Sequence, residues 1–375
     1  MSTAGTAPLV VAERCAIVGG GLASLAAFAT LRHGGVAAGE IVVFGAHADP
    51  TEAWRRRAAS IRQRRMRSES DGHLAPAAFP GLALRAAWRT RSPRPLADTV
   101  TRGYHPAVDD FLAHADAVRA RCGWDASFVR RGVARIAAVD GGFEIDGEGP
   151  FAHVLVATGH PGLALPDALA GDPRAVHAYE PHDYAERVTI VGAGMAAATE
   201  WANALEAGSE VVSVRRREPL RRPLNVPRPL FSRRGLASFH RTPPEQRAAL
   251  LRELGAPSYP PDARFDAVLA AAAAEGRFRV TAELNGAEQV IAATGFRRGF
   301  RNDPLLARLV DEHTLAVHDR WIVLAPDSTV PALTDERRTL SLAGVAGQWA
   351  FPAGDTIAGA KYAARRFLEH VCRTR

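Results

Sequence analysis

The feature that most constrains the fold of this chain is a strand, glycine loop and helix that occur in this order twice. The apolar stretch Cys15–Val18 runs into Gly-Gly-Gly-Leu-Ala-Ser at residues 19–24, and Val188–Val191 runs into Gly-Ala-Gly-Met-Ala-Ala at residues 192–197. In each case a helical pattern follows, and then a second apolar strand, at residues 41–44 and 211–214. Two β-α-β openings of this kind predict two dinucleotide-binding units in one chain.

The residue types in the two loops are those that a bound pyrophosphate requires. The first glycine permits the tight turn out of the strand, and the second lets the backbone approach the pyrophosphate. The third position must be small, so that the helix can pack on the strand, and the free N–H groups at the helix start then bind the phosphate oxygens. The candidate residues are Gly19, Gly21 and Ser24 in the first loop, and Gly192, Gly194 and Ala197 in the second.

The second strands of the two units end differently. Arg215, Arg216 and Arg217 follow the strand of the second unit, where a carboxylate would bind the ribose of NAD and an arginine would accept the 2′-phosphate of NADP. Eight of the twenty residues from 215 to 234 are arginine. We therefore expect NADPH at the second unit, the alternative being a solvated basic strand end.

The first unit departs from this pattern at the end of its second strand. A ribose-binding acid is expected there, but the residue is Gly45, and Asp49 is out of register. The departure concerns the adenosine half of a bound dinucleotide and leaves the pyrophosphate half of the prediction unchanged.

Three further segments carry a resemblance to a known group of proteins. Strands end at Ala157-Thr158-Gly159 and at Ala293-Thr294-Gly295-Phe296, and Gly354-Asp355-Thr356 stands near the C-terminus. With the two loops, these segments resemble the two-dinucleotide-binding-domain flavoproteins. The resemblance implies FAD at the first unit and NADPH at the second. It also implies domain crossings at Thr158, Gly159, Thr294 and Gly295, and contacts to the flavin from Gly354, Asp355 and Thr356, a plain helix cap being the alternative for Asp355.

Within that superfamily the chain is most similar to the class B flavin-dependent monooxygenases, the flavin-containing and N-hydroxylating branches. The extended region from Trp54 to Tyr104, the Ala-Thr-Gly-Phe segment and the lack of a C-x-x-C pair carry this resemblance. The flavin monooxygenase fingerprint is altered, since Gly171 lies farther before His177, and Tyr179 closer behind it, than the fingerprint requires.

The expected fold class is α/β, with two Rossmann-like dinucleotide-binding domains and the NADPH domain inserted into the FAD domain. We place the first part of the FAD domain at residues 1–180, the NADPH domain at 181–291 and the second part of the FAD domain at 292–375. Elsewhere the patterns predict helices at Pro244–Leu254 and Ala263–Ala274. Residues 91–101, which include two prolines, are predicted to form a loop.

The resemblance implies an FAD-dependent, NADPH-consuming oxidoreductase. NADPH would reduce the flavin, and the C4a-hydroperoxide formed with O₂ would oxygenate a small-molecule amine, sulfur or carbonyl substrate. The polar segment 67–73 is expected to line the flavin, with Arg67 as a cofactor ligand and Asp71 and His73 as candidates for proton transfer, a surface loop being the alternative. An NADPH-dependent reductase that passes electrons to a partner, and a non-catalytic FAD/NADP-binding protein, remain open.

Composition excludes several other classes. The net charge is +7, but 46 of the 47 basic residues are arginine, which is typical of a GC-rich genome, so no nucleic-acid role is expected. Cys15, Cys122 and Cys372 are far apart, with no C-x-x-C pair, which argues against a disulfide reductase or a structural zinc site and indicates a reducing compartment. No apolar run approaches the length of a membrane span, so we expect a cytoplasmic protein. A homo-oligomer is a separate expectation.

Overall fold

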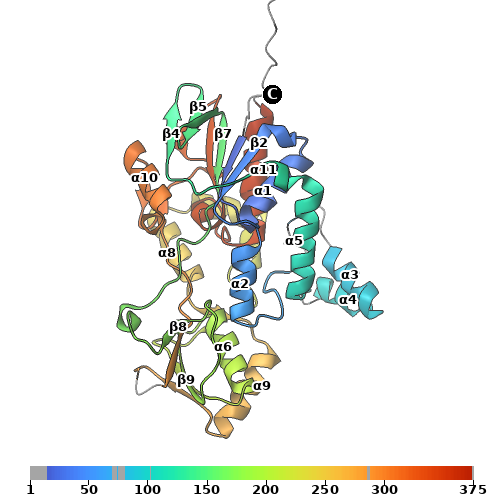
Figure 1. Ribbon diagram of the computed structural model, residues 1–375, viewed down its shortest axis with the longest axis vertical. Helices are drawn as coiled ribbons and strands as arrows, with labels where there is room; N and C mark the ends of the chain where they lie inside the picture. The colour runs from blue at the N-terminus through green and yellow to red at the C-terminus, as the bar shows by residue number, and fades with distance from the viewer. Residues whose placement is uncertain (1–14, 70–73, 75–80, 102, 285–287, 374–375) are drawn as a thin grey trace, which may run out of the picture.

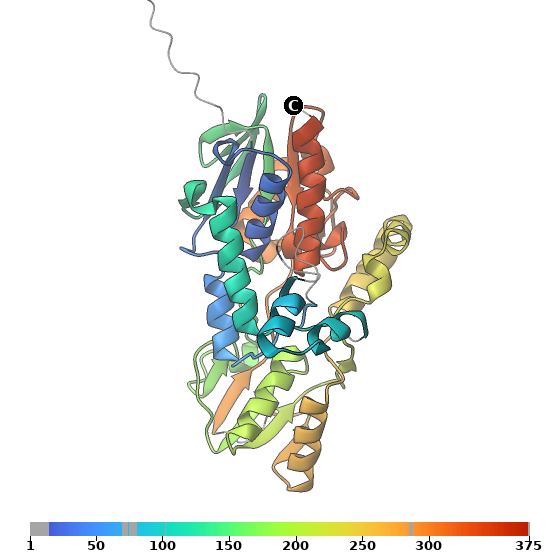
Figure 2. The same cartoon turned by 90° about the vertical axis from the view of Figure 1, so that its right-hand side faces the viewer.

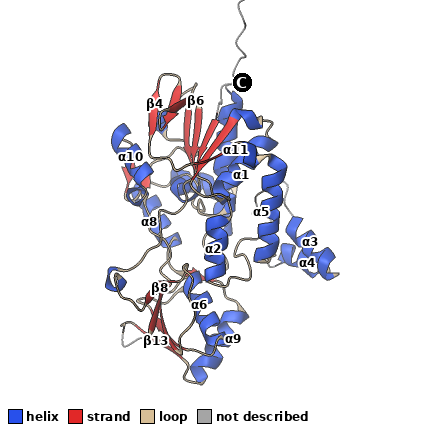
Figure 3. Ribbon diagram, in the orientation of Figure 1, coloured by secondary structure: helices blue, strands red, loops and turns tan. Residues whose placement is uncertain are grey.

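The chain forms two lobes, each built on a five-stranded parallel sheet (Figure 1). The computed structural model describes residues 15–69, 74, 81–101, 103–284 and 288–373. Figure 3 shows the two groups of strands at opposite ends of the molecule, each accompanied by helices. Within the described residues, no helix combines the length and the apolar character that crossing a membrane would require.

The first lobe has the strand order β17-β7-β1-β2-β3. Helices pack on one face of its sheet, where Ile17 and Leu155 share a core with three helices, and a three-stranded antiparallel sheet covers the other face, where Phe143 packs near Val18. Both faces are thus buried, which is why β1 is apolar throughout. The strands are β1 (Cys15–Val18), β2 (Ile41–Gly45), β3 (Phe128–Arg130), β7 (His153–Val156), β17 (Thr339–Leu342), β4 (Ile136–Val139), β5 (Gly142–Ile145) and β6 (Glu148–Phe151), and the helices are α1 (Leu22–His33), α5 (Val108–Cys122) and α11 (Ile357–Arg373).

The second lobe has the strand order β13-β10-β9-β14-β8, and all of these strands lie between β7 and β17 in the sequence. The predicted fold class is therefore confirmed: the structure is α/β, with one Rossmann-like unit inserted into another. The elements are β8 (Ala175–His177), β9 (Arg187–Val191), β10 (Glu210–Val214), β13 (Phe278–Thr281), β14 (Gln289–Ala292), α6 (Met195–Glu206) and α9 (Ala263–Ala274).

The remaining elements lie around these two sheets. They are the helices α2 (Glu52–Ser60), α3 (Gly81–Thr90), α4 (Arg94–Thr101), α7 (Arg233–Arg241), α8 (Pro244–Leu254) and α10 (Pro304–His313), and the short strands β11 (Leu220–Arg221), β12 (Ser258–Tyr259), β15 (Val317–His318) and β16 (Trp321–Ile322). Figure 1 shows α3 and α4 projecting from the body of the molecule below α5, and Figure 2 shows the yellow helices α7 and α8 projecting from another side. The predicted helices at residues 244–254 and 263–274 are confirmed.

One local prediction was wrong. Residues 91–101 were expected to form a loop, but α4 occupies Arg94–Thr101. Pro95 is the second residue of this helix, where the missing N–H of proline costs no intrahelical hydrogen bond. The backbone oxygen of Pro93 accepts hydrogen bonds from Leu96 and Ala97, so both prolines help to start the helix.

The segment after α2 attaches the first lobe to the second. Ile61 packs into the core of the second lobe, and its carbonyl oxygen accepts a hydrogen bond from the Asn203 side chain of α6 at 2.8 Å. Arg62 pairs with Asp183 at 3.1 Å, and Arg64 pairs with Glu206 at 3.0 Å. These contacts hold the helix that follows the second glycine loop against the first lobe.

A buried acid lies on the same helix. Glu200 is completely buried, and its Oε2 accepts hydrogen bonds from Tyr184 at 2.9 Å and from His182 Nε2 at 3.0 Å. Burial alone would lower the pKa of His182, but its hydrogen bond to Glu200 and the charge of Glu200 raise that pKa above its ordinary value of 6.5. The folded protein therefore favours charged His182.

We predict that this pair makes stability depend on pH. Because the folded pKa of His182 is raised, its stabilising contribution is complete below the ordinary pKa near 6.5 and disappears as the pH rises through the folded value. In Glu200→Gln the pKa of His182 should fall, since the negative charge is lost while the side-chain size is kept. NMR titration of the His182 ring measures this directly. Glu206→Gln, which removes an exposed acid from the same helix, should leave the titration unchanged.

Candidate functional site

The first glycine loop leaves an open space at the start of α1. Gly19 has a φ of 122°, and a Cβ there would lie 2.3 Å from the carbonyl oxygen of Ala157, so that only glycine fits. At Gly21, the N-cap residue of α1, an added Cβ would have no described atom within 4 Å. No described side chain caps α1, and its first turn contains no acid. The first N–H groups of the helix are therefore available to an anion.

The second glycine loop repeats this construction. Gly192 has a φ of 139°, and a Cβ there would lie 2.4 Å from the carbonyl oxygen of Ala293. Gly194 is the N-cap residue of α6 and has open space beside it, and among the described side chains none caps this helix. Each loop thus closes on the alanine of an Ala-Thr-Gly segment at the end of the neighbouring strand of its own sheet.

The third small residue of each loop packs as the sequence predicts. Ser24 and Ala197 are completely buried between helix and sheet. The Ser24 hydroxyl has no hydrogen-bond partner in the described part of the chain. This indicates that serine suits this position because it is small, and not because its hydroxyl forms a hydrogen bond. Both loops therefore fit a pyrophosphate group: each is open where the phosphate would lie and closely packed beneath.

Gly45 is explained by the packing of β2 against the first loop. A Cβ at Gly45 would lie 2.4 Å from Gly20 Cα, so no acidic side chain can stand at this strand end. Asp49 does not replace it, because its carboxylate accepts hydrogen bonds from Thr51 and pairs with Arg119 at 2.5 Å. The sequence position of the usual ribose acid thus serves close backbone packing in this chain.

The three arginines at the end of β10 divide into two roles. Arg215 pairs with Glu218 at 2.9 Å, and its guanidinium lies 5.6 Å from the centre of the Trp201 ring, so it folds back onto α6. Arg216 and Arg217 are exposed and have no ion-pair partner among the described residues. These two arginines are the cations at this strand end that are available to a phosphate group.

The two domain crossings run side by side. Ala164 N–H donates to the Gly295 oxygen at 3.0 Å, and Arg297 N–H donates to the Gly162 oxygen at 3.0 Å. The Thr294 hydroxyl donates to the Ala164 oxygen. The chain therefore passes between the lobes twice along one hydrogen-bonded line.

Thr158 is anchored separately. Its hydroxyl donates to Asp303 Oδ2 at 2.6 Å, and Asp303 Oδ1 accepts from the Leu305 N–H at 3.0 Å and so caps α10. Local sequence signals could not have revealed this partner, because Thr158 and Asp303 are far apart in the chain.

The segment before α11 leaves the acid Asp355 exposed. A Cβ at Gly354 would lie 2.6 Å from the Gly344 oxygen, so this turn requires glycine. Thr356 caps α11, its Oγ1 accepting from the Gly359 N–H at 3.2 Å, which shows that Asp355 is not the helix cap. Asp355 is exposed to solvent. The protein atoms that surround its carboxyl group nevertheless raise the pKa of that group by desolvation, while the charges of Arg298 and Arg67 act to lower it.

Arg67 joins the two lobes beside Asp355. Its guanidinium donates to the Ser258 oxygen at 3.2 Å and to the Arg222 oxygen at 3.0 Å, both in the second lobe. Burial lowers the pKa of Arg67 to about 10, with the charge of Asp355 opposing the shift, so Arg67 remains charged at neutral pH. Of the other candidates in segment 67–73, Asp71 and His73 lie outside the described residues.

Sequence reasoning missed a column of stacked rings at the crossings. The rings of His160 and Phe296 have centroids 4.3 Å apart, and those of Phe296 and Tyr179 have centroids 5.0 Å apart. The Arg57 guanidinium lies 4.8 Å from the Phe296 centroid. Burial, followed by the charges of Arg298 and Arg57, lowers the pKa of His160 to about 4, so its ring is neutral. The available signal was an aromatic or His residue after each Thr-Gly pair.

A large cleft opens beside the second glycine loop. Its volume is about 1200 Å³, which is enough for a dinucleotide end together with a small molecule. Met195 and Thr199, from the first turns of α6, form one side, and residues of α3 and α4 contribute to the other. Within the described residues there is no group of three or more His, Cys, Asp or Glu that could hold a metal ion.

No protein-family profile matches this sequence, and no curated protein matches it either. Among solved structures the chain is similar to an ornithine N-hydroxylase from Kutzneria sp. 744, with a TM-score of 0.72, 14% identity and coverage of 96% of this chain and 99% of that one. An ornithine hydroxylase from Pseudomonas aeruginosa matches with a TM-score of 0.67, 19% identity and coverage of 96% and 100%.

A third similar structure is a cadaverine monooxygenase from Erwinia amylovora, crystallised with FAD, with a TM-score of 0.69, 13% identity and coverage of 96% and 94%. These likenesses extend over nearly the whole of each chain. They establish that the two-lobed arrangement is that of known FAD-containing proteins.

We predict that Gly45→Ala destabilises the first lobe. The added methyl group would overlap Gly20, and relieving an overpacked contact of this kind costs about 1–3 kcal/mol of unfolding free energy. Urea denaturation followed by circular dichroism measures the change. The matched control is Gly39→Ala, since a Cβ at Gly39 meets no described atom within 4 Å. Equal stability of the two variants would contradict the close contact.

Proposed function

We propose that the protein is an FAD-dependent, NADPH-consuming oxidoreductase, and specifically a monooxygenase that uses O₂ to oxygenate an amine, sulfur or carbonyl group of a small molecule. The observation that carries this proposal is the pair of open helix starts at Gly21 and Gly194, each closed from beneath by an Ala-Thr-Gly strand end. The similarity to three monooxygenases over nearly the whole chain supports it.

FAD would be held by the first lobe. Its pyrophosphate would lie on the loop of Gly19 and Gly21, above the buried Ser24, and its flavin end would reach the crossing at Thr158 and Gly159. Gly354, Asp355 and Thr356 lie at the start of α11 and would contact the flavin from there, and the charge of Asp355 acts on Arg67. The domain division that goes with this assignment is residues 1–180 and 292–375 for FAD, and 181–291 for NADPH, although β8 (Ala175–His177) pairs with β14 in the sheet of the second lobe.

NADPH would be held by the second lobe. Its pyrophosphate would lie on the loop of Gly192 and Gly194, above Ala197, and Thr294 and Gly295 would flank its nicotinamide end at the second crossing. The exposed Arg216 and Arg217 would bind the 2′-phosphate, and Arg215 would support them from its place over Trp201. These assignments follow from the position of each residue at the carboxyl edge of its sheet.

When bound, FAD would accept a hydride from NADPH and activate O₂ for transfer. The protein's own residues would position the two cofactors and exclude water. The ring of His160 stacks on the ring of Phe296 where the two crossing segments meet, and because the His160 ring is neutral it adds no charge there. Asp355 provides a carboxyl group that can hydrogen-bond to a bound hydroxyl group. Burial raises the pKa of this carboxyl group, and the charges of Arg298 and Arg67 oppose the shift. Asp71 and His73 remain candidates for proton transfer.

The expected partners are the small-molecule substrate and O₂, with no role for nucleic acid. The separation of Cys15, Cys122 and Cys372 in the sequence favours a reducing compartment and hence a cytoplasmic location. A homo-oligomer remains a prediction.

Spectroscopy of the purified protein tests the proposal. We expect a bound flavin spectrum that NADPH bleaches in the absence of air, and NADPH oxidation in air that rises when an accepted amine, thioether or ketone is added. The oxygenated product should appear in proportion to the NADPH consumed. NADPH-driven reduction of an electron acceptor without any oxygenated product would instead support the reductase alternative. A colourless protein that cannot be reconstituted with FAD would refute both.

A second prediction concerns the choice of nicotinamide cofactor. In Arg216→Gln/Arg217→Gln, KM for NADPH should rise roughly tenfold or more, because charge-assisted contacts to a phosphate are lost. KM for NADH should change little, since NADH lacks that phosphate. Arg187→Gln is the control, because Arg187 is exposed at the opposite end of the same sheet. Equal losses for both cofactors would contradict the proposed role.

A further inference from the structure

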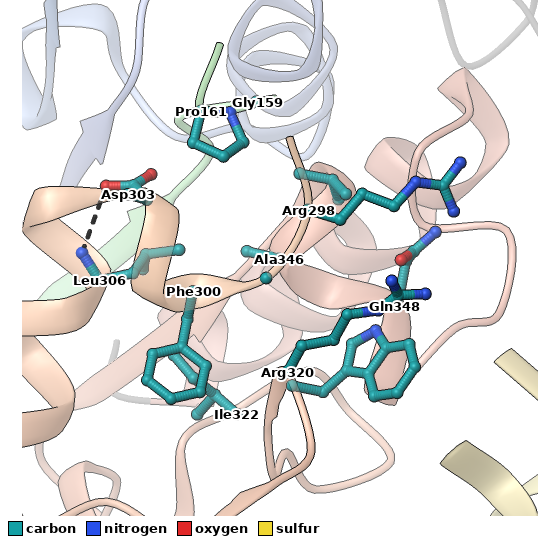
Figure 4. Close-up of a pocket in the computed structure, with 13 residues that line it drawn as sticks. Gly159, Pro161, Arg298, Phe300, Asp303, Leu306, Arg320, Ile322, Ala346 and Gln348 are labelled. Carbon is teal, nitrogen blue, oxygen red and sulfur yellow. Dashed lines mark hydrogen bonds between the residues drawn. The ribbon is translucent and has the colours of Figure 1, made fainter. Parts of the chain in front are cut away.

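A small pocket lies between the crossing segments and the C-terminal part of the first lobe (Figure 4). Its lining includes Gly159 from the first crossing, Arg298 just after the second, and Gln348 from the turn of 3₁₀ helix at Gly344–Trp349. We call it the Arg298–Arg320 pocket. The Gln348 side chain also interacts with Asp355, so Asp355 lies next to this pocket.

Two cations meet in this pocket without a matching anion. The side chains of Arg298 and Arg320 extend toward Gln348 on the same side of the pocket (Figure 4). Neither guanidinium is within ion-pair distance of a carboxylate in the part of the chain that the structure describes. Arg320 lies over the Trp321 ring, 4.7 Å from its centroid. Burial lowers the pKa of Arg320, and the charge of Arg298 lowers it further, as expected for two neighbouring cations.

The acids near the pocket are already engaged. Asp303 lies on the opposite side of the pocket and binds Thr158 and the start of α10 (Figure 4). Asp319 pairs with Arg252 at 2.6 Å. Asp355 acts on Arg298 only at longer range and also acts on Arg67. Neither guanidinium group therefore has a carboxylate within ion-pair distance among the described residues, while Asp355 acts on Arg298 and Asp319 acts on Arg320 from farther away.

The size and the walls of the pocket restrict what could neutralise that charge. The cavity measures about 30 Å³, which accepts a group the size of a carboxylate but not a whole small molecule. Phe300, Trp321 and Ile322 supply apolar walls. A planar anion between two guanidinium groups and an amide would gain charge-assisted hydrogen bonds that water alone does not provide.

We propose that the Arg298–Arg320 pocket binds the carboxylate of a small organic ligand, whose remaining atoms extend past Gln348 toward Asp355. Arg298 and Arg320 bind the carboxylate oxygens, and the Gln348 amide orients them. That this ligand is the molecule oxygenated is a conclusion that rests on the proposed function. That the pocket binds a carboxylate does not depend on it.

Isothermal titration calorimetry of the full-length protein, with the flavin it carries, tests the pocket without turnover. The probes are 5-aminopentanoate and pentylamine, which have the same number of carbon atoms and differ in the carboxylate. We expect 5-aminopentanoate to bind at least tenfold more tightly. Arg298→Gln and Arg320→Gln should each weaken its binding about tenfold or more, and Arg320→Lys should restore part of it. Arg308→Gln, an exposed arginine on α10, should bind as the wild type does.

Several results would overturn the proposal. These are equal affinity for the two probes, unchanged affinity in both Gln variants, equally tight binding of inorganic phosphate, and displacement of 5-aminopentanoate by NADP⁺, which would assign the pocket to the nucleotide. Melting curves of each variant show that it is folded. Binding without any NADPH oxidation would leave the carboxylate pocket in place and refute the proposed oxygenation.

Discussion

The contact on which the rest of this structure depends is the approach of a glycine to the carbonyl oxygen of the neighbouring strand. Gly19 lies on Ala157, and Gly192 lies on Ala293, each at a distance that leaves no room for a Cβ. This contact lets the chain turn from strand to helix at once, so that the helix begins at the sheet edge with its N–H groups exposed. The same geometry in both lobes explains why the glycine loops and the Ala-Thr-Gly segments occur as pairs.

The two lobes are related by more than a repeated motif. The residues after each Thr-Gly pair leave one sheet and cross to the other, and they are hydrogen-bonded to each other along the way. His160 and Phe296 follow these pairs and stack on one another, so that each crossing supplies one ring of a shared column. The edges of the sheets where cofactors are proposed to bind are thereby brought to one central region, together with Asp355 and Arg67.

The sequence was most informative where structure is decided locally. Glycine loops, apolar strands and the helices α8 and α9 have residue patterns of short range, and their positions could be predicted. The prolines near α4 were misleading because proline breaks a helix interior but is accepted in a first turn. Contacts between distant segments had no such signal. The Asp303 partner of Thr158, the return of Arg215 onto Trp201 and the meeting of Arg298 with Arg320 all depend on tertiary packing.

The double crossing also determines how one lobe can move against the other. A domain joined to its neighbour by a single segment can rotate about that segment. Two adjacent segments that are hydrogen-bonded to each other resist such rotation, so bending of one lobe relative to the other is the easier motion. The bend would take place next to the His160–Phe296 pair and would widen or narrow the space above Asp355. Any such bend would have to stretch or break the contacts that join the lobes, which are those of Arg67 with Ser258, Ile61 with Asn203, Arg62 with Asp183 and Arg64 with Glu206.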